Sequence, residues 1–259
     1  MRSSSEGYGH GCPYWALGQN PRLATGPPLY DRDHFKTSGP KIGLYKIPPM
    51  PFTIEEFLSV FRQYNLDVWP IQVFLIFLAI ILIVLVHREK PTPSRIINII
   101  LGSFWLWMGV VYHILYFSEI NKAAYIFGLL FIAQALLFGY LALYYKQGII
   151  YGRPSSMKSI LGWVFMGYAL LAYPVLAVAF GHSYPEMPTF GLPCPTTIFT
   201  FGLLMFSVNR IPRYIVVIPF FWSLLGFSAA MSLGILEDTG LVIAGVVGAA
   251  VLLFHKGEG

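Results

Sequence analysis

Charged side chains are scarce in this chain: Asp, Glu, Lys and Arg make up 11% of its 259 residues, whereas hydrophobic residues make up 56%. A soluble domain usually carries about 25% charged residues. So few charges cannot cover a water-facing globule of this length, which excludes an ordinary soluble protein. The net charge of +5 does not indicate nucleic-acid binding either, because the basic residues lie in short segments beside apolar stretches.

Cysteine is equally scarce. The chain has Cys12 and Cys194 only, and neither belongs to a CxxC pair, which excludes a zinc or redox motif of that kind. Both are expected near the outer membrane face, where a disulfide between them is permitted. The sequence also lacks a Gly-rich phosphate loop. It contains no recognisable catalytic set of a nucleophile, a general base and a general acid. We therefore do not expect an enzyme.

What the chain has instead is seven apolar stretches, most of them close to the roughly 20 residues that cross a bilayer. They cover residues 68–86, 96–117, 123–145, 158–180, 193–208, 213–234 and 240–255. The fifth and seventh are short, which allows a tilted or partly re-entrant segment. We predict an all-α fold: a bundle of seven transmembrane helices, multi-pass in the inner or plasma membrane, with the lipid bilayer as its partner and a homo-oligomer permitted.

Lys and Arg alternate between high and low content along the loops. The loops after the second, fourth and sixth stretches carry only one Lys and no Arg between them. The loops after the first, third and fifth stretches contain Arg88, Lys90, Arg95, Lys146, Arg153, Lys158, Arg210 and Arg213. Short basic loops stay in the cytoplasm. The pattern therefore predicts an N-terminus outside and a C-terminus in the cytoplasm.

Residues 1–49 differ from the rest, since they are rich in Gly, Pro and Ser and lack an apolar period. They are either a disordered tail or a mis-called start, with translation beginning at Met50. Residues 50–67 then read as an amphipathic helix on the outer membrane surface, because Thr53 and Glu56 have the spacing of a capping box and apolar residues follow at helical spacing. The seven-helix domain is expected over residues 68–256.

The second and third stretches echo the sixth and seventh. Phe104-Trp105 followed by Gly109 matches Phe221-Trp222 followed by Gly226, and a Leu-Leu-Phe triplet recurs at nearly the same offset. The pattern predicts a 3+1+3 arrangement of two parallel repeats, unless chance similarity between apolar helices produces it. Parallel repeats are known in transporters, where the substrate site lies near the repeat interface.

The most unusual segment is 181–202, GHSYPEMPTFGLPCPTTIFTFG, which holds four prolines. Proline breaks helices, and free backbone groups cannot face lipid, so this segment is either a stiff loop that caps the bundle or the wall of a site at the outer mouth. We predict that His113 and this loop share a polar vestibule that binds substrate. Its candidate residues are His113, Tyr116, His182, Tyr184, Glu186, Cys194 and Thr196.

His113 is the one histidine well inside an apolar stretch. Ionisable groups there are functional candidates, and the alternative is a neutral histidine bonded to a carbonyl or a tyrosine. We expect no cofactor, although His113 and His182 with Cys194 or Glu186 would suit copper or haem if they converged. The seventh stretch has no Lys, which excludes a retinal Schiff base there.

Three segments resemble a known family: residues 105–113 (WLWMGVVYH), 121–140 (NKAAYIFGLLFIAQALLFGY) and 182–202. They are similar to uncharacterised bacterial multi-spanning proteins with a domain of unknown function, which are often labelled permeases or major-facilitator transporters. The resemblance covers roughly residues 50 to 256 and implies no substrate or catalytic residue. The facilitator label fits badly, because that fold has twelve spans and this sequence has seven apolar stretches.

Three functions compete on the sequence alone. A small-molecule permease or permease component fits the seven stretches, the repeat and the Pro-rich segment. A haem- or copper-binding membrane protein requires His113 and His182 to come together. A non-catalytic accessory subunit of a membrane complex predicts an exposed apolar face and no cavity.

Overall fold

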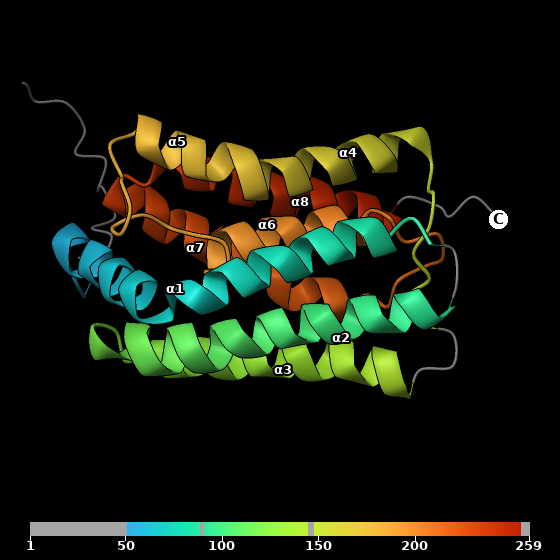
Figure 1. Ribbon diagram of the computed structural model, residues 1–259, viewed down its shortest axis with the longest axis horizontal. Helices are drawn as coiled ribbons and strands as arrows, with labels where there is room; N and C mark the ends of the chain where they lie inside the picture. Colours follow the sequence, from blue (N-terminus) through green and yellow to red (C-terminus); the bar gives the residue numbers. More distant parts are fainter. Residues whose placement is uncertain (1–50, 89–90, 145–147, 255–259) are drawn as a thin grey trace, which may run out of the picture. The chain divides into compact units, whose positions relative to one another are not determined.

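Helices form every long element in the part of the chain that the computed structural model describes, residues 51–88, 91–144 and 148–254 (Figure 1). The α-helices are α1 (Ile54–Leu85), α2 (Pro91–Trp107), α3 (Ala124–Leu143), α4 (Ser156–Gly167), α5 (Tyr173–Ala179), α6 (Pro193–Leu204), α7 (Tyr214–Leu233) and α8 (Thr239–Phe254). The tail over residues 1–49 lies outside the described residues, so neither explanation of it is tested.

Four further helical pieces extend these helices. The π-helix η1 (Met108–Tyr116) and the 3-10 turn η2 (Phe117–Glu119) continue α2. The π-helix η3 (Tyr168–Ala172) joins α4 to α5, and the 3-10 turn η4 (Leu236–Asp238) leads into α8. The predicted all-α class is therefore confirmed.

Six helical segments are long and apolar enough to cross a membrane, which supports an integral membrane protein. The sequence predicted seven transmembrane helices, of which the fifth, over residues 193–208, was expected to be short, and this stretch is the one that is too short in the structure. There α6 has 12 residues, or about 18 Å at 1.5 Å per residue, against a hydrocarbon core of roughly 30 Å. The helix ends early because the chain then pairs with the segment after α3, where the Val208 amide donates to the Ile150 carbonyl over 2.9 Å.

Helix α6 lies inside the bundle, and its residues from Pro195 to Leu204 are all buried (Figure 1). It approaches α4 through two glycines. A Cβ atom added to Gly202 would lie 2.9 Å from the Met166 nitrogen, and one added to Gly162 would lie 2.9 Å from the Gly202 carbonyl oxygen. Contacts of real Cβ atoms are longer than this, so the close crossing of α4 and α6 requires glycine at both positions.

Helix α8 packs through small residues that recur every four positions. A Cβ on Gly240 would lie 2.2 Å from the Tyr168 ring, and one on Gly248 would lie 2.6 Å from the Phe201 ring, while Ala244 between them is fully buried. Small residues let helices approach closely. This stripe is therefore a packing surface against η3 and α6.

Helix α1 begins with the predicted capping box. The Thr53 amide donates to Glu56 Oε2 over 2.8 Å, and the Glu56 amide donates to Thr53 Oγ1 over 3.2 Å. The helix then continues through Pro70 to Leu85 as one element. The sequence had instead predicted an interfacial helix over residues 50–67 and a separate transmembrane helix over residues 68–86. Figure 1 shows the ribbon of α1 changing direction partway along, as expected for a helix with an internal proline.

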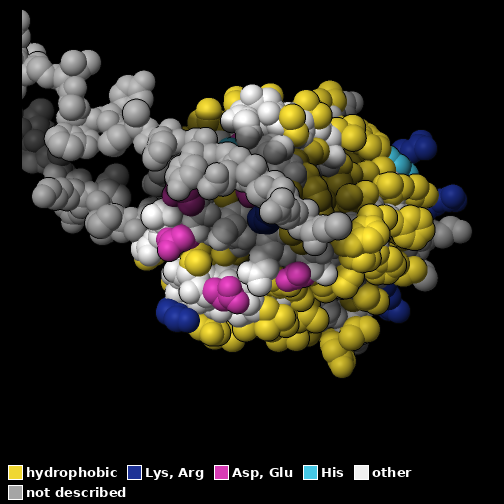
Figure 2. Space-filling view, turned by 60° about the vertical axis from the view of Figure 1, so that its left-hand side comes forward, with side chains coloured by type: hydrophobic (Ala, Val, Ile, Leu, Met, Phe, Trp, Pro, Cys, Tyr) yellow, Lys and Arg dark blue, Asp and Glu magenta, His cyan; other side chains and the backbone are white. Residues whose placement is uncertain are grey.

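We call the end of the bundle where α1, α3 and α8 begin the outer end, after the predicted orientation, and the opposite end the inner end (Figure 1). The described acidic residues lie in segments at the outer end: Glu55, Glu56, Asp67, Glu119, Glu186, Glu237 and Asp238. Figure 2 shows acidic side chains on the end turned forward, with some Lys and Arg side chains among them, and further Lys and Arg side chains at the opposite edge. Such a charge asymmetry is what the loop pattern predicted, while the orientation itself stays a prediction.

The two matched glycines of the predicted repeat have similar roles. A Cβ on Gly109 would lie 2.9 Å from the Gly128 carbonyl oxygen on α3, and one on Gly226 would lie 2.9 Å from Leu241 Cδ2 on α8. In each case the following helix packs against the glycine. The parallel repeat is still a prediction, since this similarity concerns one position in each half.

Candidate functional site

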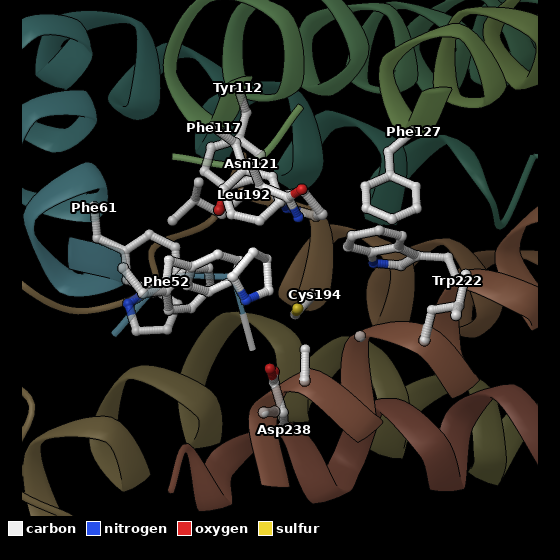
Figure 3. Close-up of a pocket in the computed structure, with 18 of the residues that line it drawn as sticks. Phe52, Phe61, Tyr112, Phe117, Asn121, Phe127, Leu192, Cys194, Trp222 and Asp238 are labelled. Carbon is white, nitrogen blue, oxygen red and sulfur yellow. The ribbon is translucent and has the colours of Figure 1, made fainter. Parts of the chain in front are cut away.

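A cavity of about 210 Å³ lies at the outer end of the bundle (Figure 3). It is bounded by α1 and the residues before it, by η1, by the start of α6, and by α7 and η4. Most of its lining is aromatic or aliphatic, and it includes Phe52, Phe57, Phe61, Tyr112, Phe117, Phe127, Tyr173, Leu192, Cys194, Trp222, Ala230 and Asp238. The site is thus an apolar, largely aromatic chamber with one acidic side chain in its wall.

Two π-helices place aromatic side chains in this wall. In η1 the helix widens, so that the Phe117 amide donates to the carbonyls of both Tyr112 and His113. In η3 the widened turn leads directly to Tyr173 and Pro174, and proline has no amide hydrogen to donate. Widened turns of this kind occur often at functional sites. Here they turn Tyr112 and Tyr173 toward the cavity.

The carboxylate in the wall belongs to Asp238, whose exposed fraction is 4%. The Tyr173 hydroxyl donates a hydrogen bond to Asp238 Oδ1, and the Cys194 thiol lies beside the same carboxyl group (Figure 3). Asp238 comes directly before the first residue of α8. The positive end of the helix dipole favours an acidic group at this position.

A second carboxylate, that of Glu237, is completely buried next to Asp238. Its Oε1 atom lies 2.9 Å from Nδ1 of His182, and its Oε2 atom has no hydrogen-bond partner within the described part of the chain. The Tyr168 hydroxyl donates to the Glu237 main-chain oxygen over 2.6 Å. Across residues 51–88, 91–144 and 148–254, no Lys or Arg forms an ion pair with either acid.

His113 lies behind the cavity wall. It is fully buried, and its ring centroid is 4.6 Å from that of Phe131 and 5.1 Å from that of Trp222. Neither ring nitrogen has a hydrogen-bond partner among the residues that the structure describes. The sequence predicted a polar vestibule shared by His113 and the Pro-rich loop, whereas the structure brings Cys194 and Tyr112 to an apolar cavity and leaves His113 outside its lining.

The other predicted site residues attach the Pro-rich loop and its neighbours to the bundle. Tyr116 donates to Asp67 Oδ2 over 3.0 Å, and Tyr184 donates to the main-chain oxygen of Asn65 over 3.2 Å. Glu186 pairs with Arg62 at 3.2 Å, at an exposed position. The Thr196 hydroxyl accepts the Gly191 amide over 3.0 Å. Of the seven predicted residues, Cys194 is the one in the cavity lining.

A buried polar clamp on α1, missed at the sequence level, holds the Pro-rich loop. Asn65 Nδ2 donates to the carbonyls of Pro185 and Met187 over 2.6 and 2.8 Å. Gln72 Nε2 donates to Asn65 Oδ1 over 2.6 Å and to the Thr189 hydroxyl over 2.9 Å. The loop's free backbone oxygens are thereby satisfied inside the protein. The sequence did contain an indication of this clamp, because Asn65 and Gln72 are seven positions apart and therefore share one helix face.

The structure also shows which residues could hold a metal. Within the described segments, no three or more His, Cys, Asp or Glu side chains are grouped so that they could hold a metal ion. His182 contacts Glu237, while His113 is surrounded by aromatic rings. The arrangement therefore offers a carboxylate, a thiol and aromatic faces to a small organic ligand.

Comparison with known proteins gives one match. A family model described as a family of unknown function, DUF6064, matches residues 54–258. No curated protein and no solved structure matches the chain.

Proposed function

We propose that this chain, which belongs to the DUF6064 family, a family of unknown function, is a membrane protein that binds a small organic cation in the outer-end cavity. The cavity would be the outer binding site of a permease. One observation carries the proposal: a buried carboxylate, Asp238, stands in the wall of an otherwise apolar and aromatic cavity.

The charge of the site favours a cation. Glu237 and Asp238 are adjacent and buried, and among the described residues His182 is the basic side chain that contacts Glu237. A buried carboxylate is costly unless a proton, a hydrogen bond or a cation stabilises it. An organic cation in the cavity would place a positive charge against Asp238.

The aromatic lining favours the same kind of ligand. Tyr112, Tyr173 and Trp222 line the cavity, as do several Phe side chains. A cation near an aromatic face gains about 0.5–2 kcal/mol, more when water is excluded, and quaternary ammonium groups are recognised in this way. A volume of about 210 Å³ is below the roughly 300–1,000 Å³ of pockets for drug-sized ligands, so the ligand is compact.

A permease is supported by the position of the cavity. Its lining residues come from α1, η1 and α3, which belong to the first predicted repeat, and from α6, α7 and η4, which belong to the second, with Tyr173 of α5 between them. Transporters built from repeats bind substrate at such an interface. Beneath the cavity, Phe199 and Phe201 of α6 are fully buried. Transport would therefore require α6 or its neighbours to move.

Calorimetric titration of the purified protein in lipid nanodiscs tests the ligand class. Choline and its uncharged carbon isostere, 3,3-dimethyl-1-butanol, have the same shape and differ in charge. We expect choline to bind at least tenfold more tightly. Asp238→Asn should weaken choline binding at least tenfold, because it removes the charge and keeps the shape of the side chain. Asp67→Asn is the matched control, since Asp67 is exposed at the same end of the bundle.

The outcomes separate the parts of the proposal. Equal affinity for both compounds would leave a cavity that binds small molecules and refute the preference for cations. Unchanged choline binding by Asp238→Asn would show that the binding site lies elsewhere in the protein. Uptake of labelled choline into proteoliposomes, reduced in Asp238→Asn and unchanged in Asp67→Asn, supports a permease; binding without uptake contradicts transport of this probe.

A further inference from the structure

We propose that a second cavity, at the inner end, binds the phosphate group of an anionic lipid or of a free phosphate ion. This cavity has a volume of about 130 Å³ and lies between the start of α4, the segment after α6 and the end of α8. Its lining contains three basic side chains, those of Arg153, Lys158 and Arg210. None of the described acidic residues lines it.

The first turn of α4 supplies a further reason for an anion. Ser155 is the N-cap of α4, and its side chain makes no capping hydrogen bond. Ser155 lines the cavity, and its hydroxyl group is buried and has no hydrogen-bond partner within the described residues. The first amides of a helix point outward without partners, and the helix dipole favours a negative charge there. A phosphate in the cavity would therefore meet a hydroxyl and a helix N-terminus as well as three cations.

The walls of this cavity are held by hydrogen bonds. Asn209 Nδ2 donates to the Gly148 carbonyl over 2.8 Å, and Asn209 Oδ1 accepts the Ile150 amide over 2.9 Å. The Gly152 amide donates to the Phe206 carbonyl over 3.0 Å. Lys158 Nζ donates to the Ser207 carbonyl over 2.5 Å. The two segments that carry Arg153 and Arg210 are thus fixed to each other, so their backbone needs little ordering when an anion binds.

The surroundings favour a phosphate that belongs to a lipid. Val208, which is 40% exposed, and Val251 and Leu252 near the end of α8 line the same cavity. A phosphate among the basic residues would leave an acyl chain next to this apolar surface. Basic pockets between transmembrane helices on the cytoplasmic side bind anionic headgroups in this manner.

Native mass spectrometry of the full protein tests the site and distinguishes the two sources. Protein in nanodiscs of phosphatidylcholine with phosphatidylglycerol should retain phosphatidylglycerol preferentially. The double variant Arg153→Gln/Arg210→Gln should lower its retention at least fivefold. The control Arg88→Gln/Arg95→Gln removes two exposed charges at the same end, outside the cavity lining, and should change retention less than twofold.

A second variant distinguishes loss of lipid binding from loss of the folded structure. Ser155→Asp places a carboxylate in the cavity and provides a good helix N-cap, so it should keep or raise the melting temperature while it abolishes retention. Inorganic phosphate, titrated into phosphatidylcholine nanodiscs, identifies a free anion as the source if it raises the melting temperature of the wild type and not of Ser155→Asp. Equal losses in both double variants, or no preference for phosphatidylglycerol together with no response to phosphate, would overturn the proposal.

Discussion

Asn65 illustrates how single polar residues organise the outer end. Its side chain is fully buried and bonds to two carbonyls of the Pro-rich loop, to Gln72 and to Thr189. The same loop receives a hydrogen bond from Tyr64 to the Gly191 carbonyl over 3.3 Å. A loop with few regular backbone bonds is stable here because α1 supplies the partners.

Asn65→Ala should therefore destabilise the protein by about 3 kcal/mol, since it leaves several buried polar groups without partners at about 1–3 kcal/mol each. The measurement is the free energy of unfolding in detergent, with proteolysis of the 181–192 loop as a local readout. Gln63→Ala serves as the control, because Gln63 is exposed on the same helix. Equal stability of the two variants would show that the clamp does not hold the loop.

The burial of His113 leads to a different prediction. Since its two ring nitrogens lack partners in the described part of the chain and its neighbours are aromatic, His113→Phe should keep the fold and raise its unfolding free energy, by up to about 2 kcal/mol, through removal of unsatisfied polar groups. Thermal unfolding and choline affinity check this. A large loss of either would mean that the imidazole has a partner or a ligand, which would favour the haem or copper alternative.

Residue chemistry at the site could be predicted only in part. Cys194 was found because the fifth apolar stretch is predicted to begin at the outer face, which places this residue at its outer end. Asp238 was missed as a site residue, because its importance comes from contacts with Tyr173 and Cys194 that are distant in the sequence. Its position at a helix start does not by itself distinguish it from an exposed cap.

At the scale of elements, the crossing of α4 and α6 depends on glycine. A Cβ on Gly162 would lie 2.4 Å from the Phe206 ring and 2.9 Å from the Gly202 carbonyl oxygen, whereas one on Gly167 of the same helix would meet nothing within 4 Å. Gly162→Ala should thus cost about 1–3 kcal/mol of unfolding free energy through overpacking. Gly167→Ala should be neutral or stabilising by up to about 1 kcal/mol. The same effect in both would contradict close packing of the two helices.

The elements themselves were predictable where local rules decide them. The capping box of Thr53 and Glu56 fixes the start of α1, and apolar runs locate the six long helices. The shortness of α6 was less accessible, because Val208 pairs with Ile150 across distant loops. The π-helices η1 and η3 follow from packing and have no simple sequence pattern, so the orientation of Tyr112 and Tyr173 could not be predicted.

At the scale of the whole helical bundle, the charges and the two cavities form one arrangement. The described acidic residues lie at the outer end, where an apolar cavity contains a carboxylate, and the inner cavity is lined by basic residues. The predicted orientation puts the acidic cavity outside, because short basic segments stay in the cytoplasm. A cation would then meet the acidic end first.

The rate at which Cys194 reacts with thiol reagents added to intact cells tests this account most directly, because that thiol lines the cavity beside Asp238. In a Cys12→Ser background, the membrane-impermeant trimethylammonium-ethyl methanethiosulfonate should modify Cys194 from outside, faster than its sulfonate analogue and more slowly when choline is present. Asp238→Asn should remove the preference for the cationic reagent. Modification only after the membrane is permeabilised, or equal rates for the two reagents without protection by choline, would contradict an outward-facing cavity that binds organic cations.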